Sequence, residues 1–131
     1  MKNERQRAIA FLFGCIGTRL GLAMLARASL ASPSRLSPQR QGILRYGLAV
    51  ASIAIASGLL FHFLAGTRPD AFEAGGEVWW NTLRPVHAFL YFMFAILAIR
   101  DHKSAWMFLL ADTILGLVAW ITHRFPQFLA A

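Results

Sequence analysis

The sequence predicts an all-α fold, an integral membrane bundle of four transmembrane helices that run up-down-up-down. Of its 131 residues, 57% are hydrophobic and only 15% are charged, which lies well outside the averages of soluble proteins. Four apolar stretches are also long enough for a hydrocarbon core of about 30 Å. Because the connections between them are short, we expect residues 1–131 to form a single transmembrane domain.

The four expected spans cover residues 8–27, 44–66, 84–100 and 104–124. The first is interrupted only by Arg19, the second and third contain long uncharged stretches, and the fourth is interrupted only by Asp112. Basic residues precede the first apolar stretch, as in a signal peptide. We expect this segment to be a retained helix.

Small residues indicate which face of each helix turns inward, because they let helices approach closely in lipid. At helical spacing they form one stripe in each span, and polar residues lie on or continue the stripes of the last three spans. We therefore expect the polar groups to point into the bundle. The stripes are Gly14, Gly17 and Gly21; Gly47, Ala51, Ala54, Gly58 and Ala65, continued by His62; His87, Tyr91, Ala95 and Ala98; and Asp112, Gly116, Ala119 and His123.

Arg19 and Asp112 form the first candidate site. With a rise of about 1.5 Å per residue, both lie near the middle of their helices, where a charge costs roughly 2.5–3.5 kcal/mol. Pairing would lower that cost, so we expect an ion pair. It has two interpretations: a structural pair that fixes the register of the first and last helices, or a gate or binding pair for a transported species.

Three histidines form the second candidate site. His62, His87 and His123 all lie near the membrane side that carries the N-terminus, which we call side A; the opposite side is side B. Beside them is the loop of residues 66–84. We expect this mouth to include Glu73, Glu77, Trp79, Trp80, Asn81, Arg84 and Tyr91. Imidazoles there could be ordinary interfacial residues, handle protons or anions, or bind a metal.

The sequence assigns no cofactor. The three histidines are weak metal candidates, since no closely spaced ligand motif is present, and a haem would need two of them to face each other across the bundle. No catalytic arrangement of Ser, His and Asp or Gly-rich phosphate loop stands out either. We expect no enzymatic activity, with a metal-dependent membrane enzyme as an open alternative.

The formal net charge of +7 indicates contact with membrane lipids rather than with nucleic acid, because the basic residues are dispersed along the segments that flank the spans. Six Lys and Arg residues fall on each side, so the positive-inside rule predicts no orientation. Such a balance is also typical of dual-topology dimers. We expect membrane lipids as partners, a homo-oligomer, and no nucleic acid.

Three segments carry a family resemblance: GCIGTR (residues 14–19), GGEVWWNTLRPVHAFLYFMFA (75–95) and AWMFLLADTILGL (105–117). In these the chain resembles an uncharacterised family of small four-span membrane proteins associated with large DNA viruses of algae and related microbial genomes. The resemblance implies a shared site but no activity. That site would comprise Arg19, Trp79, Trp80, Asn81, Arg84, His87 and Asp112.

The function that we expect is channel- or transporter-like handling of protons, a small anion or a small polar solute. The motivating observation is the predicted inward placement of every intramembrane polar group. The alternative is a non-catalytic structural or assembly subunit, in which the same groups only specify helix packing.

Overall fold

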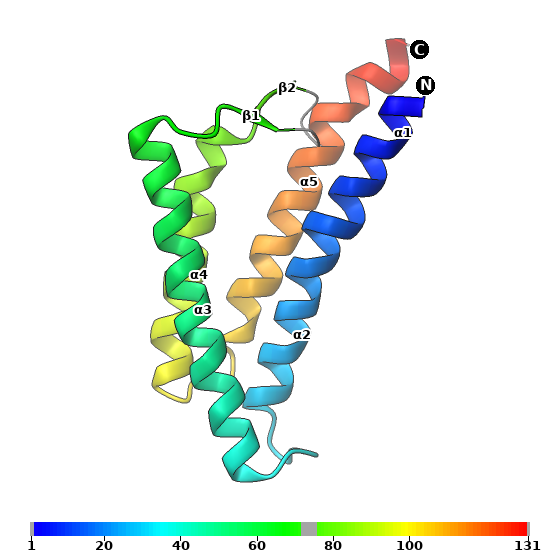
Figure 1. The fold of residues 1–131 in the computed structure, drawn as a ribbon. Helices are drawn as coiled ribbons and strands as arrows, with labels where there is room; N and C mark the ends of the chain where they lie inside the picture. The colour runs from blue at the N-terminus through cyan, green and yellow to red at the C-terminus, as the bar shows by residue number, and fades with distance from the viewer. Residues whose placement is uncertain (1, 72–75, 131) are drawn as a thin grey trace.

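The chain folds, in a computed structural model that describes residues 2–71 and 76–130, into an all-α bundle. Four of its helical segments are long and apolar enough to cross a membrane: Asn3–Leu30, Pro38–Ala65, Asn81–Ile99 and Trp106–Pro126. Both ends of the chain lie at the same end of the bundle (Figure 1). The predicted fold class and the up-down-up-down threading are therefore confirmed.

The first span is one continuous rod built from three segments, α1 (Lys2–Ile9), η1 (Ala10–Gly17) and α2 (Thr18–Leu30). Ile9 and Gly17, which join these segments, keep right-handed helical backbone angles. The middle segment is a π-helix, a form that is rare and often found at functional sites. Because a π-helix winds less tightly than an α-helix, this segment changes the direction in which the side chains before Arg19 point.

Helix α3 (Pro38–Ala65) is the longest, with 28 residues. Ser37 caps its start by accepting a hydrogen bond from the backbone N–H of Arg40, and Pro38 occupies the first turn, as is common at helix starts. Gly66 ends it with a positive φ of 65°, the left-handed conformation that glycine adopts most readily at a helix C-terminus.

The connection on side A contains β1 (Asp70–Ala71), β2 (Gly76–Glu77) and the 3-10 turn η2 (Asn81–Leu83). The two strands pair in antiparallel fashion, and the segment lies over one end of the bundle (Figure 1). Helix α4 (Arg84–Ile99) follows with 16 residues. After a short turn on side B, α5 (Trp106–Ala130) returns to side A with 25 residues.

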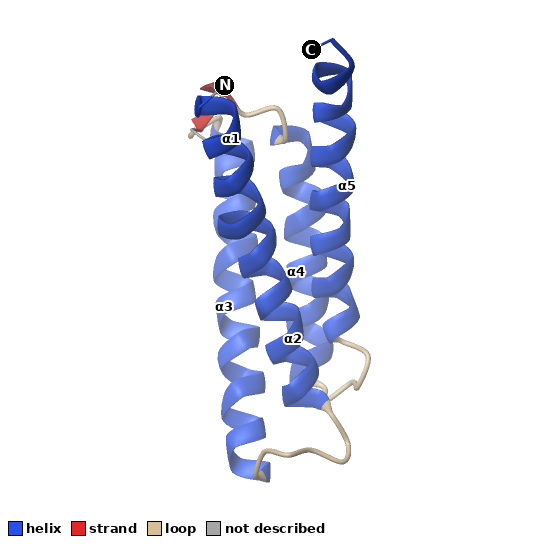
Figure 2. Cartoon of the chain, turned by 90° about the vertical axis from the view of Figure 1, so that its right-hand side faces the viewer, coloured by secondary structure: helices blue, strands red, loops and turns tan. Residues whose placement is uncertain are grey.

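The helices form a closed ring of antiparallel neighbours. Helix α3 packs on α4, α4 on α5, α5 on α2, and α2 back on α3, and all four rods run along a common axis (Figure 2). On side B, Arg45 of α3 donates a hydrogen bond of 2.6 Å to Asp101 in the α4–α5 turn. These contacts fix the register from which the interior is built.

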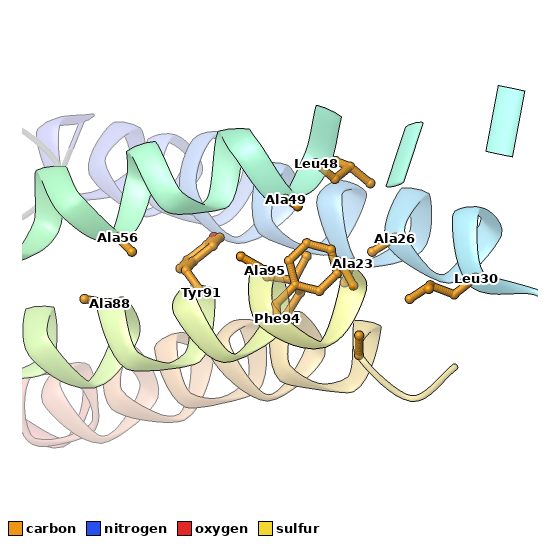
Figure 3. Close-up of a cluster of buried hydrophobic side chains, with 13 residues drawn as sticks. Ala23, Ala26, Leu30, Leu48, Ala49, Ala56, Ala88, Tyr91, Phe94 and Ala95 are labelled. Carbon is orange, nitrogen blue, oxygen red and sulfur yellow. The ribbon is translucent and has the colours of Figure 1, made fainter. Parts of the chain in front are cut away.

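The core is rich in alanine and concentrated toward side B. Buried alanines of α2, α3 and α4 belong to one cluster with Phe94 (Figure 3). Since lipid tails are as apolar as leucine, helices in a membrane associate through close packing rather than through hydrophobic burial. Large apolar side chains point outward instead, for example Phe13, Ile43, Val50 and Leu64, which is the surface that a lipid environment requires.

Two of the predicted inward stripes are wrong. Gly14, Gly17 and Gly21 of the first rod are exposed. In α3 the predicted stripe is also mostly exposed, and the buried face carries Leu48, Ala49, Ser52 and Ala56. The first rod and α3 each carry two stripes of small residues. Packing alone decides which of them meets a neighbour, because lipid and protein offer similarly apolar surroundings.

The other two stripes are inward as predicted. His87, Tyr91, Ala95 and Ala98 of α4 are all buried. In α5, Asp112 and Gly116 are buried, Ala119 is half-buried, and His123 at the end of the stripe is exposed. His87 of α4 and Asp112 of α5 therefore meet in the interior of the bundle.

Candidate functional site

Three polar side chains from three helices meet in the interior: Arg19 of α2, His87 of α4 and Asp112 of α5. Arg19 Nη1 donates to Asp112 Oδ2 at 2.7 Å and lies 3.1 Å from His87 Nδ1. His87 Nδ1 also contacts Asp112 Oδ1 closely. We call these residues the polar cluster; the predicted ion pair is present in it.

The polar cluster is largely buried, and its carboxylate is fully so. Asp112 is 0% exposed and His87 is 4% exposed, while the Arg19 side chain is 18% exposed. A carboxylate buried to this degree needs a charged or hydrogen-bonding partner for each oxygen. Arg19 serves one oxygen and His87 the other, so both Asp112 oxygens are satisfied.

Local structure explains how the three side chains reach one another. Arg19 is at the start of α2, directly after the π-helical turn, and His87 is in the first turn of α4. Gly116, one turn after Asp112, leaves room for the imidazole: a Cβ there would lie 3.9 Å from His87 Cε1 and 3.4 Å from Ile16 Cδ1. Tyr91, one turn beyond His87, is also buried.

The hydrogen-bonding geometry restricts the protonation of the polar cluster. A ring nitrogen either carries a proton and donates or lacks one and accepts. With Asp112 ionised, Nδ1–H donates to Oδ1, and the Arg19 contact at 3.1 Å is then only electrostatic. With the proton on Asp112, Nδ1 can accept from Arg19. The arrangement therefore accommodates a shared proton in two ways.

A small cavity borders the polar cluster. It is lined by Arg19 and His87 together with Phe11, Cys15, Trp79, Trp80, Leu83, Gly116 and Ala119. Its volume is about 30 Å³, and one water needs at least about 10–15 Å³ of such volume. The cavity therefore has room for one or two waters beside the polar cluster.

Aromatic rings cover the cavity on side A. Phe11 stacks on Trp120 at 5.5 Å and lies 6.5 Å from Trp79 and 6.1 Å from Trp80 between ring centroids. Trp79 and Trp80 meet edge to face at 5.2 Å, a favoured geometry for aromatic pairs. On its other face Trp79 stacks on His123 at 4.1 Å. We call Phe11, Trp79 and Trp80 the aromatic cover.

Arg84 and Asn81 hold the side-A connection against the helices. Arg84 Nη1 donates to the Asn81 side chain at 2.9 Å and to the Thr67 carbonyl at 3.2 Å, and Nη2 donates to the Arg68 carbonyl at 3.0 Å. These bonds tie the end of α3 to the start of α4, and they position Trp79 and Trp80 over the cavity.

The structure does not bring the three predicted histidines together. His62 Nδ1 pairs with the Thr67 hydroxyl at 2.6 Å, His123 stacks on Trp79, and His87 belongs to the polar cluster. Among the described residues, no three His, Cys, Asp or Glu side chains lie close enough to hold a metal ion. The histidine metal site and the paired haem ligands therefore find no support in the described geometry.

The predicted mouth divides into parts. Trp79 and Trp80 border the cavity, Asn81 and Arg84 anchor the connection, and Tyr91 lies below His87. Glu73 lies outside the described residues. The backbone of Glu77 pairs with that of Asp70, but its side chain is outside the described part of the chain.

His87 lies deeper than the sequence predicts. Counting residues placed it at the mouth, because it is near the start of its span. Helix α4 is much shorter than α5 and the first rod, however, and both of these extend beyond its first turn (Figure 1). The first turn of α4 therefore lies beside residues well inside these longer helices, and His87 joins the ion pair instead of the mouth.

Sequence reasoning missed Phe11 and Cys15 as lining residues of the cavity. Both precede Arg19 at intervals of four residues, a spacing that places them on the face of the first rod that carries Arg19. The stripe Phe11, Cys15 and Arg19 was the available signal, and the exposed glycine stripe on another face concealed it.

A comparison with family models, with curated proteins and with solved structures finds no match for the chain. The resemblance to the four-span family of large algal DNA viruses therefore stays a prediction.

Proposed function

We propose that the chain binds protons in the polar cluster and relays them across the membrane that it spans. The observation that carries this proposal is the position of His87 between a buried carboxylate and a cavity of water size. Nδ1 is engaged by Asp112 and Arg19, so the remainder of the ring, which includes Nε2, is the part that can line the cavity.

His87 Nε2 is available for proton exchange. Within the described part of the chain it has no hydrogen-bond partner. Histidine also exchanges protons near neutral pH more readily than any other unperturbed side chain. A water in the cavity would therefore be the immediate donor or acceptor of the proton at Nε2.

The proton balance of the polar cluster follows from its three charges. In the neutral state Arg19 carries +1, Asp112 carries −1, and His87 holds its single ring proton on Nδ1. A proton that binds Nε2 converts the ring to imidazolium and the cluster to +1. Transfer of the Nδ1 proton to Asp112 then leaves a neutral ring protonated on Nε2 and a neutral carboxylic acid. In a second conformation the acid would give its proton to water on side B, and a flip of the ring would return its single proton to the side of Asp112 and restore the starting state.

Arg19 supports both states in this proposal. While Asp112 is ionised, the guanidinium compensates its charge at 2.7 Å. Once Asp112 is protonated and its hydroxyl turns away from the ring, the bare Nδ1 can accept from Arg19 Nη1 at 3.1 Å.

The size of the cavity favours a proton over the other species expected from the sequence. A cavity of about 30 Å³ holds one or two waters and leaves little room for a polar solute. Toward side B the alanine-rich core around Phe94 is closely packed. Passage to side B therefore requires a second conformation, as in an alternating-access carrier.

Proton flux into liposomes tests this proposal. The purified protein is reconstituted with a trapped pH-sensitive dye, and a potassium gradient with valinomycin sets the membrane potential. We expect wild type to acidify the lumen faster than protein-free liposomes, and we expect His87→Gln and Asp112→Asn to abolish the difference. His62→Gln is the matched control, because this histidine pairs with Thr67 outside the polar cluster.

Two results would overturn the proposal. One is wild-type flux equal to that of protein-free liposomes, measured on protein with a native helical circular dichroism spectrum. The other is an unchanged flux in folded His87→Gln, since no other histidine is among the residues that line the cavity.

A structural role of the polar cluster is the second candidate, because Arg19, His87 and Asp112 join three helices and the ion pair has no net charge. This role predicts that Arg19→Leu combined with Asp112→Leu folds and retains the biological activity. Proton relay predicts that the same double variant folds but carries no flux, so one protein preparation separates the two candidates.

A further inference from the structure

We infer that the pocket around Arg84 on side A binds the phosphate group of a phospholipid headgroup. It is separate from the cavity beside the polar cluster. Its volume is about 100 Å³, and its lining residues are Gly66, Thr67, Pro69, Val78, Asn81 and Arg84. We call it the Arg84 pocket.

The guanidinium of Arg84 is buried yet keeps unused donors. The residue is 6% exposed, and it spends three N–H groups on the carbonyls of Thr67 and Arg68 and on the Asn81 amide. A guanidinium has five N–H donors, so two remain. Paired N–H groups of an arginine match two oxygens of a phosphate, which is the strongest hydrogen-bonding arrangement available to this side chain.

The charges of the described side chains around Arg84 favour an anion. The three acceptors that hold Arg84 are neutral oxygens, and the charge of Arg68 is close enough to repel that of Arg84. Among the side chains that the structure describes, no carboxylate forms an ion pair with either arginine. Burying a cation without a counterion is costly, and a bound phosphate would remove that cost.

The depth of the Arg84 pocket favours a lipid as the source of the phosphate. It lies where α3 ends at Ala65 and where α4 begins at Arg84, and residues of the side-A connection line it. Helix ends of this kind lie at the boundary between hydrocarbon and headgroups. Trp79 and Trp80 follow in the same connection, at the level that tryptophan prefers.

Lipid retention in detergent tests the inference. Full-length protein is equilibrated with dioleoyl phosphatidylglycerol, washed, and examined by native mass spectrometry, with oleate as a phosphate-free anion and inorganic phosphate as a competitor. We expect one phosphatidylglycerol per chain and no comparable retention of oleate. Arg84→Gln should weaken retention about tenfold or more, the usual effect of losing a charge-assisted hydrogen bond.

Arg68→Gln guards against a folding defect, because this side chain is exposed and its removal leaves the bonds of Arg84 intact. It should weaken retention by a smaller factor, whereas Arg100→Gln on side B should leave it unchanged. Equal retention by wild type and folded Arg84→Gln would overturn the inference, as would an equal loss in Arg100→Gln. Displacement of the lipid by an equal concentration of inorganic phosphate would assign the pocket to free phosphate and overturn the lipid assignment.

Discussion

Asp112 of α5 accepts a hydrogen bond at 2.7 Å from Arg19 of α2, across a sequence separation of 93 residues. The two residues belong to the last and first spans, so the contact closes the ring of helices. Asp112 is fully buried, and its second oxygen contacts His87 of a third helix. One carboxylate therefore links three of the four spans in the interior of the bundle.

Neutralising either member of the ion pair alone should destabilise the fold. Asp112→Asn leaves the Arg19 guanidinium without its counterion, and breaking a buried pair in this way costs about 3–5 kcal/mol. Arg19→Leu combined with Asp112→Leu removes both charges and should recover most of that loss. Reversible unfolding in mixed micelles measures the difference, and a double variant no more stable than Asp112→Asn would contradict the prediction.

Enlarging Gly116 should displace His87. A Cβ at Gly116 would lie 3.9 Å from His87 Cε1 and 3.4 Å from Ile16 Cδ1, so Gly116→Ala fits, whereas Gly116→Leu overpacks the site at a cost of about 1–3 kcal/mol. Gly21→Leu is the matched control, because no atom lies within 4 Å of a Cβ built there. Thermal unfolding of the purified variants checks the prediction. Equal melting temperatures for the two leucine variants would refute it.

Cys15 should report access to the cavity. It is the single cysteine of the chain and lines the cavity with Trp79 and Trp80. We expect a membrane-impermeant thiosulfonate reagent to modify it from side A only, and Trp79→Ala or Trp80→Ala to accelerate the reaction by opening the aromatic cover. Mass spectrometry of sealed vesicles treated on one face measures the rate.

Trp106→Ala is the control for this labelling, since Trp106 lies at the side-B start of α5 beneath Arg27. It should leave the rate for Cys15 unchanged. Modification at equal rates from both faces would show that the cavity is not confined to side A.

Acid should remove the contribution of Asp101 to stability. Lys103 donates a hydrogen bond to Asp101 and Arg45 adds its charge, and together they lower the pKa of this carboxyl below its ordinary value of 3.8. A lowered folded-state pKa stabilises the fold above the unfolded value, and this effect disappears as the pH falls through the folded pKa.

The variant Asp101→Asn isolates this effect, because asparagine tolerates the positive φ of 55° at this position better than most residues. It should melt below wild type at neutral pH, and the two melting temperatures should converge as the pH falls below 3.8. A difference that persists unchanged in strong acid would mean that the charge of Asp101 is not responsible.

Much of the fold could be predicted from the sequence, but the buried faces of the first rod and of α3 could not. Long apolar runs predict spans because a single segment can satisfy all of its own backbone hydrogen bonds in lipid only as a helix. The rare charges at positions 19 and 112 predict each other as partners. The glycine stripe of the first rod was a misleading signal. Gly14, Gly17 and Gly21 are exposed, whereas the stripe of Phe11, Cys15 and Arg19 borders the cavity.

The sequence by itself determined four membrane-crossing helices, their alternating direction, and the pairing of two opposite charges, because each of these depends on local composition and on the cost of burying charge. Only the tertiary structure decided that His87 joins that pair and that His62 and His123 do not. Depth counted along one helix says nothing of how that helix is shifted against its neighbours. Here the short α4 sets its first turn among longer helices, so the shift, rather than the spacing of residues, assembles the polar cluster.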